Sequence, residues 1–175
     1  YDAILDEPGM RHILARHEQG AGFMADGYAR ASGQTGVVCT ITGPGVTNVA
    51  TPVASAYADS IPLLVISTSL PRSSAGRQRG ELHELKDQLG VMEALAGWTR
   101  AVECVEEIPE ALRDTFRRMR TRRPQAAYLQ IPLDLLQNEA EIDTLTPAPV
   151  TPTPPSAADI AATVRLLRDA QRPLI

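Results

Sequence analysis

The sequence predicts an α/β fold of three layers, in which a mostly parallel sheet is covered by helices on both faces. Two observations support this prediction. Short apolar or β-branched runs alternate along the chain with segments of helical spacing, and such alternation with short connections is typical of parallel sheets. In addition, the run at 62–68 (PLLVIST) has no polar alternation, which indicates a strand buried on both of its faces.

The first half of the chain is expected to contain three strands and two helices. The strands are predicted at 11–15, 37–42 and 62–68, and the helices at 18–32 and 47–58. Phe23, Met24, Tyr28 and Ala29 have the spacing of an inward helix face, and Gly33 is a C-cap candidate. Thr47 or Asn48 is the expected cap of the second helix.

The second half continues the pattern and then changes character. A polar loop at 71–80 precedes helices at 85–95 and 108–121 and strands at 99–105 and 126–131. Five of the fourteen prolines then fall between Pro147 and Pro155, which predicts a stiff, extended linker. A capped helix follows at 156–170. We therefore expect one domain over 1–137, a linker over 138–155, and the start of a second domain over 156–175.

Composition excludes several classes of function. The 175 residues are 43% hydrophobic and 22% charged, as in ordinary globular domains. The net charge is −4, so the chain has no excess of basic residues to neutralise the phosphates of a nucleic acid. We therefore expect no nucleic-acid partner. No apolar run has the roughly 18 residues of a membrane span, and the first ten residues do not read as a signal peptide. We expect no membrane partner.

The two cysteines, Cys39 and Cys104, lie outside any metal-ligand pattern. We expect both to be buried free thiols in a reducing compartment, the cytoplasm. A disulfide between them is the alternative.

Glu18 is the first candidate for chemistry because it follows the predicted strand at 11–15. Ligands of open parallel sheets bind beyond the carboxyl ends of the strands. Small and apolar residues follow Glu18, and we expect the resulting desolvation to raise the pKa of its carboxyl group. Such a group suits the sharing of a proton with a ring nitrogen. The alternative is an ordinary acidic residue in the first turn of a helix.

A Gly43-Pro44-Gly45 turn follows the strand predicted at 37–42 and opens the next helix. Glycine permits positive φ or close backbone approach, and proline fixes the bend. The segment lacks the pattern of a P-loop and that of a dinucleotide fold. It is therefore either a structural turn or a loop that contacts a flat ligand.

Together these segments resemble the pyrimidine-binding (PYR) domain of thiamine diphosphate enzymes, in the acetolactate synthase-like branch. The matching motifs are RHEQGAGFMADGYAR at 16–30 and GPGVTN at 43–48. ADSIPLLVIS at 58–67 and AAYLQIPLDL at 126–135 also match. The resemblance covers about 1–137, and the segment at 156–175 looks like the start of the family's central domain.

The resemblance implies roles for individual residues. Glu18 matches the glutamate that binds the N1′ atom of the aminopyrimidine ring and favours the imino tautomer, which removes the C2 proton of the thiazolium. Pro44 and Asn48 match residues lining the aminopyrimidine pocket, and Gly43 and Gly45 shape the same turn. Phe23 matches an aromatic residue at the entrance of the active site; the alternative is a core phenylalanine.

The sequence departs from the branch at Leu82-His83-Glu84, where synthases commonly have Phe-Gln-Glu. A histidine near the reacting carbon can supply a proton near neutral pH. His83 is therefore a candidate catalytic residue that favours a decarboxylase over a synthase. A solvated loop histidine is the alternative. We expect His12 and His17 to be structural.

Other family features are missing from this sequence. The GDG…NN segment that holds Mg²⁺ and the diphosphate is absent, so we expect no metal ligands here and no activity from this chain alone. The family's first strand is expected to precede Tyr1, so we interpret the chain as a fragment. The resemblance implies a diphosphate-binding domain of a second subunit as partner, in a homodimer or homotetramer, with FAD as a further cofactor of some members.

The resemblance implies a lyase or transferase that decarboxylates or carboligates a small 2-oxo acid. Two alternatives remain open. One is the PYR subunit of a two-chain 2-oxo acid decarboxylase, and the other is a non-catalytic interaction module of the same fold.

Overall fold

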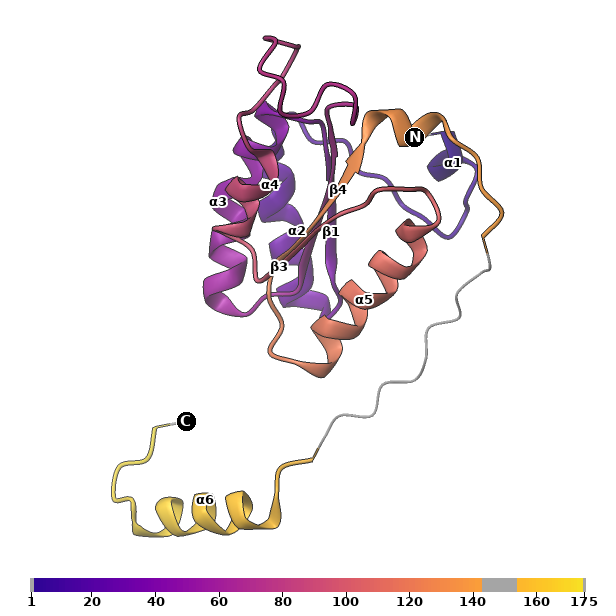
Figure 1. Ribbon diagram of the computed structural model, residues 1–175. Helices are drawn as coiled ribbons and strands as arrows, with labels where there is room; N and C mark the ends of the chain where they lie inside the picture. Colours follow the sequence, from indigo (N-terminus) through magenta and orange to yellow (C-terminus); the bar gives the residue numbers. More distant parts are fainter. Residues whose placement is uncertain (1, 143–153, 175) are drawn as a thin grey trace.

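The computed structural model describes residues 2–142 and 154–174. Four strands form one sheet: β1 (Gly36–Thr40), β2 (Leu63–Ser69), β3 (Trp98–Ala101) and β4 (Ala127–Pro132). Their order is β1-β2-β4-β3, and each neighbouring pair is parallel. The carboxyl ends of all four strands therefore lie along one edge of the sheet (Figure 1).

Helices cover both faces of this sheet, so the three-layer α/β prediction is confirmed. On one face lie α2 (Glu18–Ser32), α3 (Pro44–Asp59) and α4 (Gln88–Glu93), and on the other lies α5 (Glu107–Thr121) (Figure 1). The remaining helices are α1 (Asp2–Leu5), the 3-10 helix η1 (Leu133–Gln137) and α6 (Ala157–Asp169). None of the described helices is long and apolar enough to cross a membrane.

Two hydrophobic clusters, one on each side of the sheet, form the core. The α2–α4 side includes Val38, Val49, Val53, Leu63, Val65, Met92 and Tyr128, and the α5 side includes Leu64, Val102, Ala111, Met119, Leu129 and Leu135. Leu63, Leu64 and Val65 are consecutive and fully buried. The prediction that β2 is buried on both faces is therefore confirmed.

Helix α2 presents small residues to the core, which corrects three of the four residues of the predicted inward face. Ala29 is buried, as predicted, and so is Ala25, whereas Phe23, Met24 and Tyr28 are 43–50% exposed. The reason is the close approach of α2 to its neighbours: a Cβ on Gly22 would lie 2.7 Å from Pro52 Cβ of α3. Large side chains do not fit between helices at this spacing.

The segment at 11–15 is not a strand, which corrects the expected element. Ile13 and Leu14 are 61% and 84% exposed. A strand needs a neighbour that exchanges backbone hydrogen bonds with it, and no described strand pairs with this segment.

Some helix boundaries were predicted correctly, and the start of α3 and both ends of α4 were predicted wrongly. Gly33 is the C-cap of α2 with φ 70°, and Ser156 caps α6 by accepting a hydrogen bond from Asp159 N. Helix α3, however, starts at Pro44 with Gly43 as its N-cap, because proline without an N–H is favoured at the first helical position. Helix α4 has only six residues, shorter than the predicted 85–95.

The cysteines are both free, as predicted, but neither is buried. Cys39 lies on β1, an edge strand of the described sheet, where its side chain is exposed. The proposed linker falls mostly in 143–153, outside the described residues.

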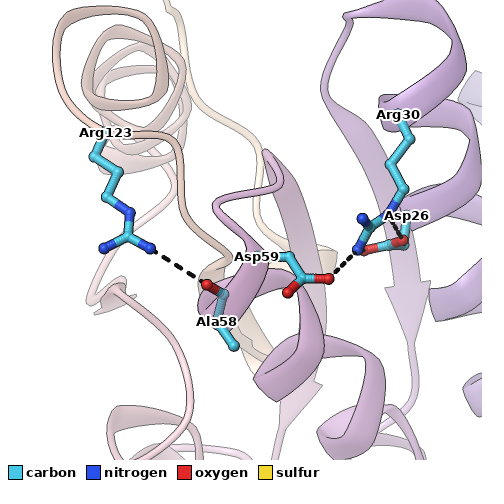
Figure 2. A network of polar contacts seen from close by, with 5 residues as sticks. All are labelled: Asp26, Arg30, Ala58, Asp59 and Arg123. Atoms are coloured by element: carbon cyan, nitrogen blue, oxygen red, sulfur yellow. Dashed lines mark hydrogen bonds and ion pairs between the residues drawn. The ribbon is translucent and has the colours of Figure 1, made fainter. Parts of the chain in front are cut away.

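An ion-pair network joins the helices at the edge of the sheet opposite the strands' carboxyl ends (Figure 2). Arg30 Nε lies 2.6 Å from a carboxylate oxygen of Asp26, which is buried, and Arg30 Nη2 lies 2.7 Å from Asp59 at the end of α3. Arg123 donates a hydrogen bond to the Ala58 carbonyl. The ion pairs of Arg30 hold the last turns of α2 and α3 together, and the Arg123 bond ties the end of α3 to the segment after α5.

Candidate functional site

Glu18 and Asn48 meet at the carboxyl edge of the sheet. Glu18 is the first residue of α2, and Asn48 lies one turn into α3. Asn48 Nδ2 donates a hydrogen bond of 3.0 Å to Glu18 Oε2. The two residues are 30 positions apart in the chain, and both are half-buried.

The pKa of Glu18 is lowered, which corrects the expectation that desolvation raises it. The amide of Asn48 contributes most, followed by the backbone N–H of Glu18, and these outweigh the opposing effect of partial burial. Hydrogen bonds to a carboxylate favour its charged form. In this chain Glu18 is therefore an ionised acceptor near neutral pH.

His17 directly precedes this carboxylate and is structural, as predicted. It is the N-cap of α2, and its Nδ1 accepts a hydrogen bond from Gln19 N at 3.1 Å. This bond satisfies one of the free N–H groups of the first helical turn. The cap fixes the start of α2 and therefore the backbone position of Glu18, the first residue of this helix.

The Gly43-Pro44-Gly45 turn contacts both Glu18 and the loop of His83. A Cβ on Gly45 would lie 3.6 Å from Glu18 Oε1. A Cβ on Gly43 would overlap the His83 carbonyl oxygen and lie 2.7 Å from His83 Cβ. Gly43 also has φ 68° and ψ −111°, a region that is open almost only to glycine.

The structure therefore brings together most of the predicted site residues. Glu18, Asn48 and Gly45 form one group, and Gly43 joins it to His83, while exposed Pro44 begins α3 between the two glycines. Phe23 is 43% exposed on α2, so the alternative of a core phenylalanine is wrong. Among the described residues, no contact connects Phe23 to the group of Glu18, Asn48 and Gly45.

Sequence reasoning missed the role of Gln88, the first residue of α4. This side chain is 8% exposed and bonds to the turn before α3 and to two strands. The available signal was the spacing, because Gln88 lies four residues before Met92 and thus on the same face of the predicted helix. The structure buries both residues. A glutamine on the apolar face of a helix needs hydrogen-bond partners in the core.

A hollow at the same edge of the sheet is lined by none of the predicted site residues. It has a volume of about 430 Å³ and is lined by Arg72, Cys104, Glu106, Asn138 and others. Arg72 is held there by Asp134 and by the Glu103 carbonyl. Within the described residues no group of three or more His, Cys, Asp or Glu side chains is placed to hold a metal.

Comparison with known proteins identifies the family of this chain. The sequence model described as the N-terminal TPP-binding domain of thiamine pyrophosphate enzymes matches residues 1–91. The chain belongs to this family. Its predicted resemblance to acetolactate synthase-like thiamine diphosphate enzymes is thus confirmed.

Individual thiamine pyrophosphate enzymes are similar over most of the chain. A probable 2-ketoarginine decarboxylase of Pseudomonas aeruginosa is 44% identical over 170 residues, which is 95% of this chain and 30% of that enzyme. The mitochondrial acetolactate synthase catalytic subunit of Saccharomyces cerevisiae is 38% identical over 85% of this chain and 22% of its own length. The large subunit of acetolactate synthase isozyme 1 of Escherichia coli is 39% identical over 82% and 25%.

The chain thus spans less than a third of the length of these relatives. They include both a decarboxylase and synthases by name.

Proposed function

We propose that this chain is the aminopyrimidine-binding and cofactor-activating part of a thiamine diphosphate enzyme that acts on a 2-oxo acid. The observation that supports this most directly is the Glu18–Asn48 pair beside Gly45. It presents a half-buried, oriented carboxylate whose pKa is lowered by the hydrogen bond from Asn48. A flat ring with an N–H donor fits these groups.

The bound cofactor would supply the carbon nucleophile that attacks the carbonyl of the 2-oxo acid. The chain's own residues have three tasks. Glu18 would share a proton with the ring nitrogen, Asn48 would orient the carboxylate, and the two glycines allow the turn to pack closely against the His83 loop and Ile41. In this proposal the domain binds the aminopyrimidine ring of the cofactor, where the proton transfer takes place.

Other parts of the proposal concern the whole enzyme. We expect Mg²⁺ and the diphosphate to be held by a domain of a second subunit, in a homodimer or homotetramer in the cytoplasm. FAD is a further cofactor in the central domain of some members of the family. The domain of the second subunit would cover the half-buried Glu18 and add desolvation, which raises the pKa of a carboxyl group. This would bring the group nearer to the pKa that efficient proton transfer requires.

Within this class, His83 favours a decarboxylase. Its backbone lies against Gly43, so the loop of His83 borders the turn that begins α3, the helix of Asn48. A histidine there can deliver a proton to the reaction centre, as release of an aldehyde requires. The relative named as a probable 2-ketoarginine decarboxylase supports the same assignment.

The test is Glu18→Gln in the full-length protein loaded with thiamine diphosphate and Mg²⁺. Exchange of the cofactor's C2 proton, followed by NMR, should slow by roughly 10²-fold or more, because general acid–base groups contribute about 10²–10⁴. The matched control is Glu107→Gln, since Glu107 also begins a helix, α5, on the other face of the sheet.

The control should exchange at the wild-type rate. Equal rates for Glu18→Gln and wild type would overturn the proposed function and return Glu18 to an ordinary acidic residue of a helix start.

A further inference from the structure

Gln88 lies at the centre of a buried hydrogen-bond network at the carboxyl edge of the sheet. Its side chain reaches the turn before α3, strand β2 and strand β4. These segments are 20 to 46 residues away in the chain. A buried amide with this many partners is costly to remove, because its loss leaves several polar groups without hydrogen bonds.

The oxygen of the amide is directed to the turn. Gln88 Oε1 accepts hydrogen bonds from Gly43 N at 2.8 Å and from Thr42 Oγ1 at 2.7 Å. Gly43 is the N-cap of α3, the helix on which Asn48 lies one turn later. The same Gly43 packs against the backbone of His83, five residues before Gln88.

The nitrogen of the amide is directed to the sheet. Gln88 Nε2 donates to the Thr68 carbonyl at 2.9 Å and lies 2.9 Å from Tyr128 Oη and 3.2 Å from Gln130 Oε1. Gly43 N can only donate and the Thr68 carbonyl can only accept, so only one orientation of the amide satisfies both. The side chain thus connects the turn rigidly to the buried centre of the sheet.

We propose that Gln88 is a positioning residue of the cofactor-activating site. It holds the turn at 42–45 in place and so sets Asn48 against Glu18 and the loop of His83 against Gly43. This inference rests on the proposed function of Glu18. It adds a residue that touches none of the reacting groups and acts through the start of α3.

Two substitutions in the full-length, cofactor-saturated protein separate positioning from general stability. Gln88→Met keeps the length of the side chain and removes all its hydrogen bonds. Met92→Ala is the matched control, because Met92 is fully buried on the same helix and belongs to the apolar core. Both should lower the melting temperature, but only Gln88→Met should slow C2 proton exchange, measured well below that temperature.

The expected decrease for Gln88→Met is tenfold to roughly 10²-fold, the effect of a displacement of about 1 Å in a catalytic group. Wild-type exchange in Gln88→Met, or equal slowing in Met92→Ala, would overturn the proposal. Rapid exchange in Glu18→Gln would instead overturn the proposed function. The two failures are therefore distinguishable.

Gln88→Glu provides an independent readout through its pH profile. A neutral carboxyl group keeps the acceptor and one of the two donors of the amide, whereas the carboxylate would face the Thr68 carbonyl without a proton to donate. Burial raises the pKa of such a group. The exchange rate of Gln88→Glu relative to wild type should therefore rise as the pH falls. A ratio that does not change with pH would overturn the proposal, even if Gln88→Met fails to fold.

Discussion

Gly43→Ala tests whether the turn before α3 and the loop of His83 are packed as closely as the structure shows. The new methyl group would overlap the His83 carbonyl oxygen and lie 2.7 Å from His83 Cβ. The backbone at Gly43, with φ 68° and ψ −111°, is also strained for alanine. The substitution therefore combines backbone strain with a steric overlap.

Gly33→Ala is the matched control, because Gly33 has φ 70° as the C-cap of α2 and a Cβ there would meet no atom within 4 Å. Its cost is the left-handed backbone alone, about 1.5 kcal/mol. Gly43→Ala adds overpacking of about 1–3 kcal/mol and a less favourable region of φ and ψ, for a total of about 4 kcal/mol.

At about 2–4 °C per kcal/mol for a domain of this size, calorimetry of the full-length protein should show this domain's melting temperature lowered by about 8–16 °C for Gly43→Ala. The corresponding decrease for Gly33→Ala is about 3–6 °C. C2 proton exchange should slow only in Gly43→Ala. Equal decreases in melting temperature for the two variants would refute the packing of His83 against Gly43.

Three further predictions concern His83, Asn48 and the network at the opposite edge. His83→Gln should lower aldehyde yield relative to carboligated product from one 2-oxo acid by roughly tenfold or more; unchanged product ratios in chromatography would assign His83 to a solvated loop. Asn48→Ala removes a bond that lowers the pKa of Glu18, so its destabilisation should be largest above the carboxyl group's unfolded pKa and vanish as the pH falls through the folded pKa; a pH-independent difference in melting temperature would contradict this. Arg30→Ala leaves buried Asp26 unpaired and should cost about 1–3 kcal/mol, against less than about 1 kcal/mol for Asp59→Ala, an exposed partner; equal losses in thermal melts would contradict it.

The sequence alone determined the elements whose signals are local. The unbroken apolar run of β2 predicted a strand buried on both faces, because burial on both faces excludes polar residues from successive positions. Gly33 marked the end of α2, since a left-handed C-cap favours glycine. The motifs around Glu18 and Gly43 also predicted the family, although not how the two segments contact each other.

Only the tertiary structure decided the contacts between distant segments. The segment at 11–15 has the composition of a strand but no described strand to pair with, and the pKa of Glu18 depends on Asn48, 30 residues later. Small residues of α2 face the core because Gly22 lies against Pro52. Gln88 binds residues up to 46 positions away. Periodicity describes one element at a time, whereas ladder pairing, desolvation and buried hydrogen bonds depend on which elements pack together.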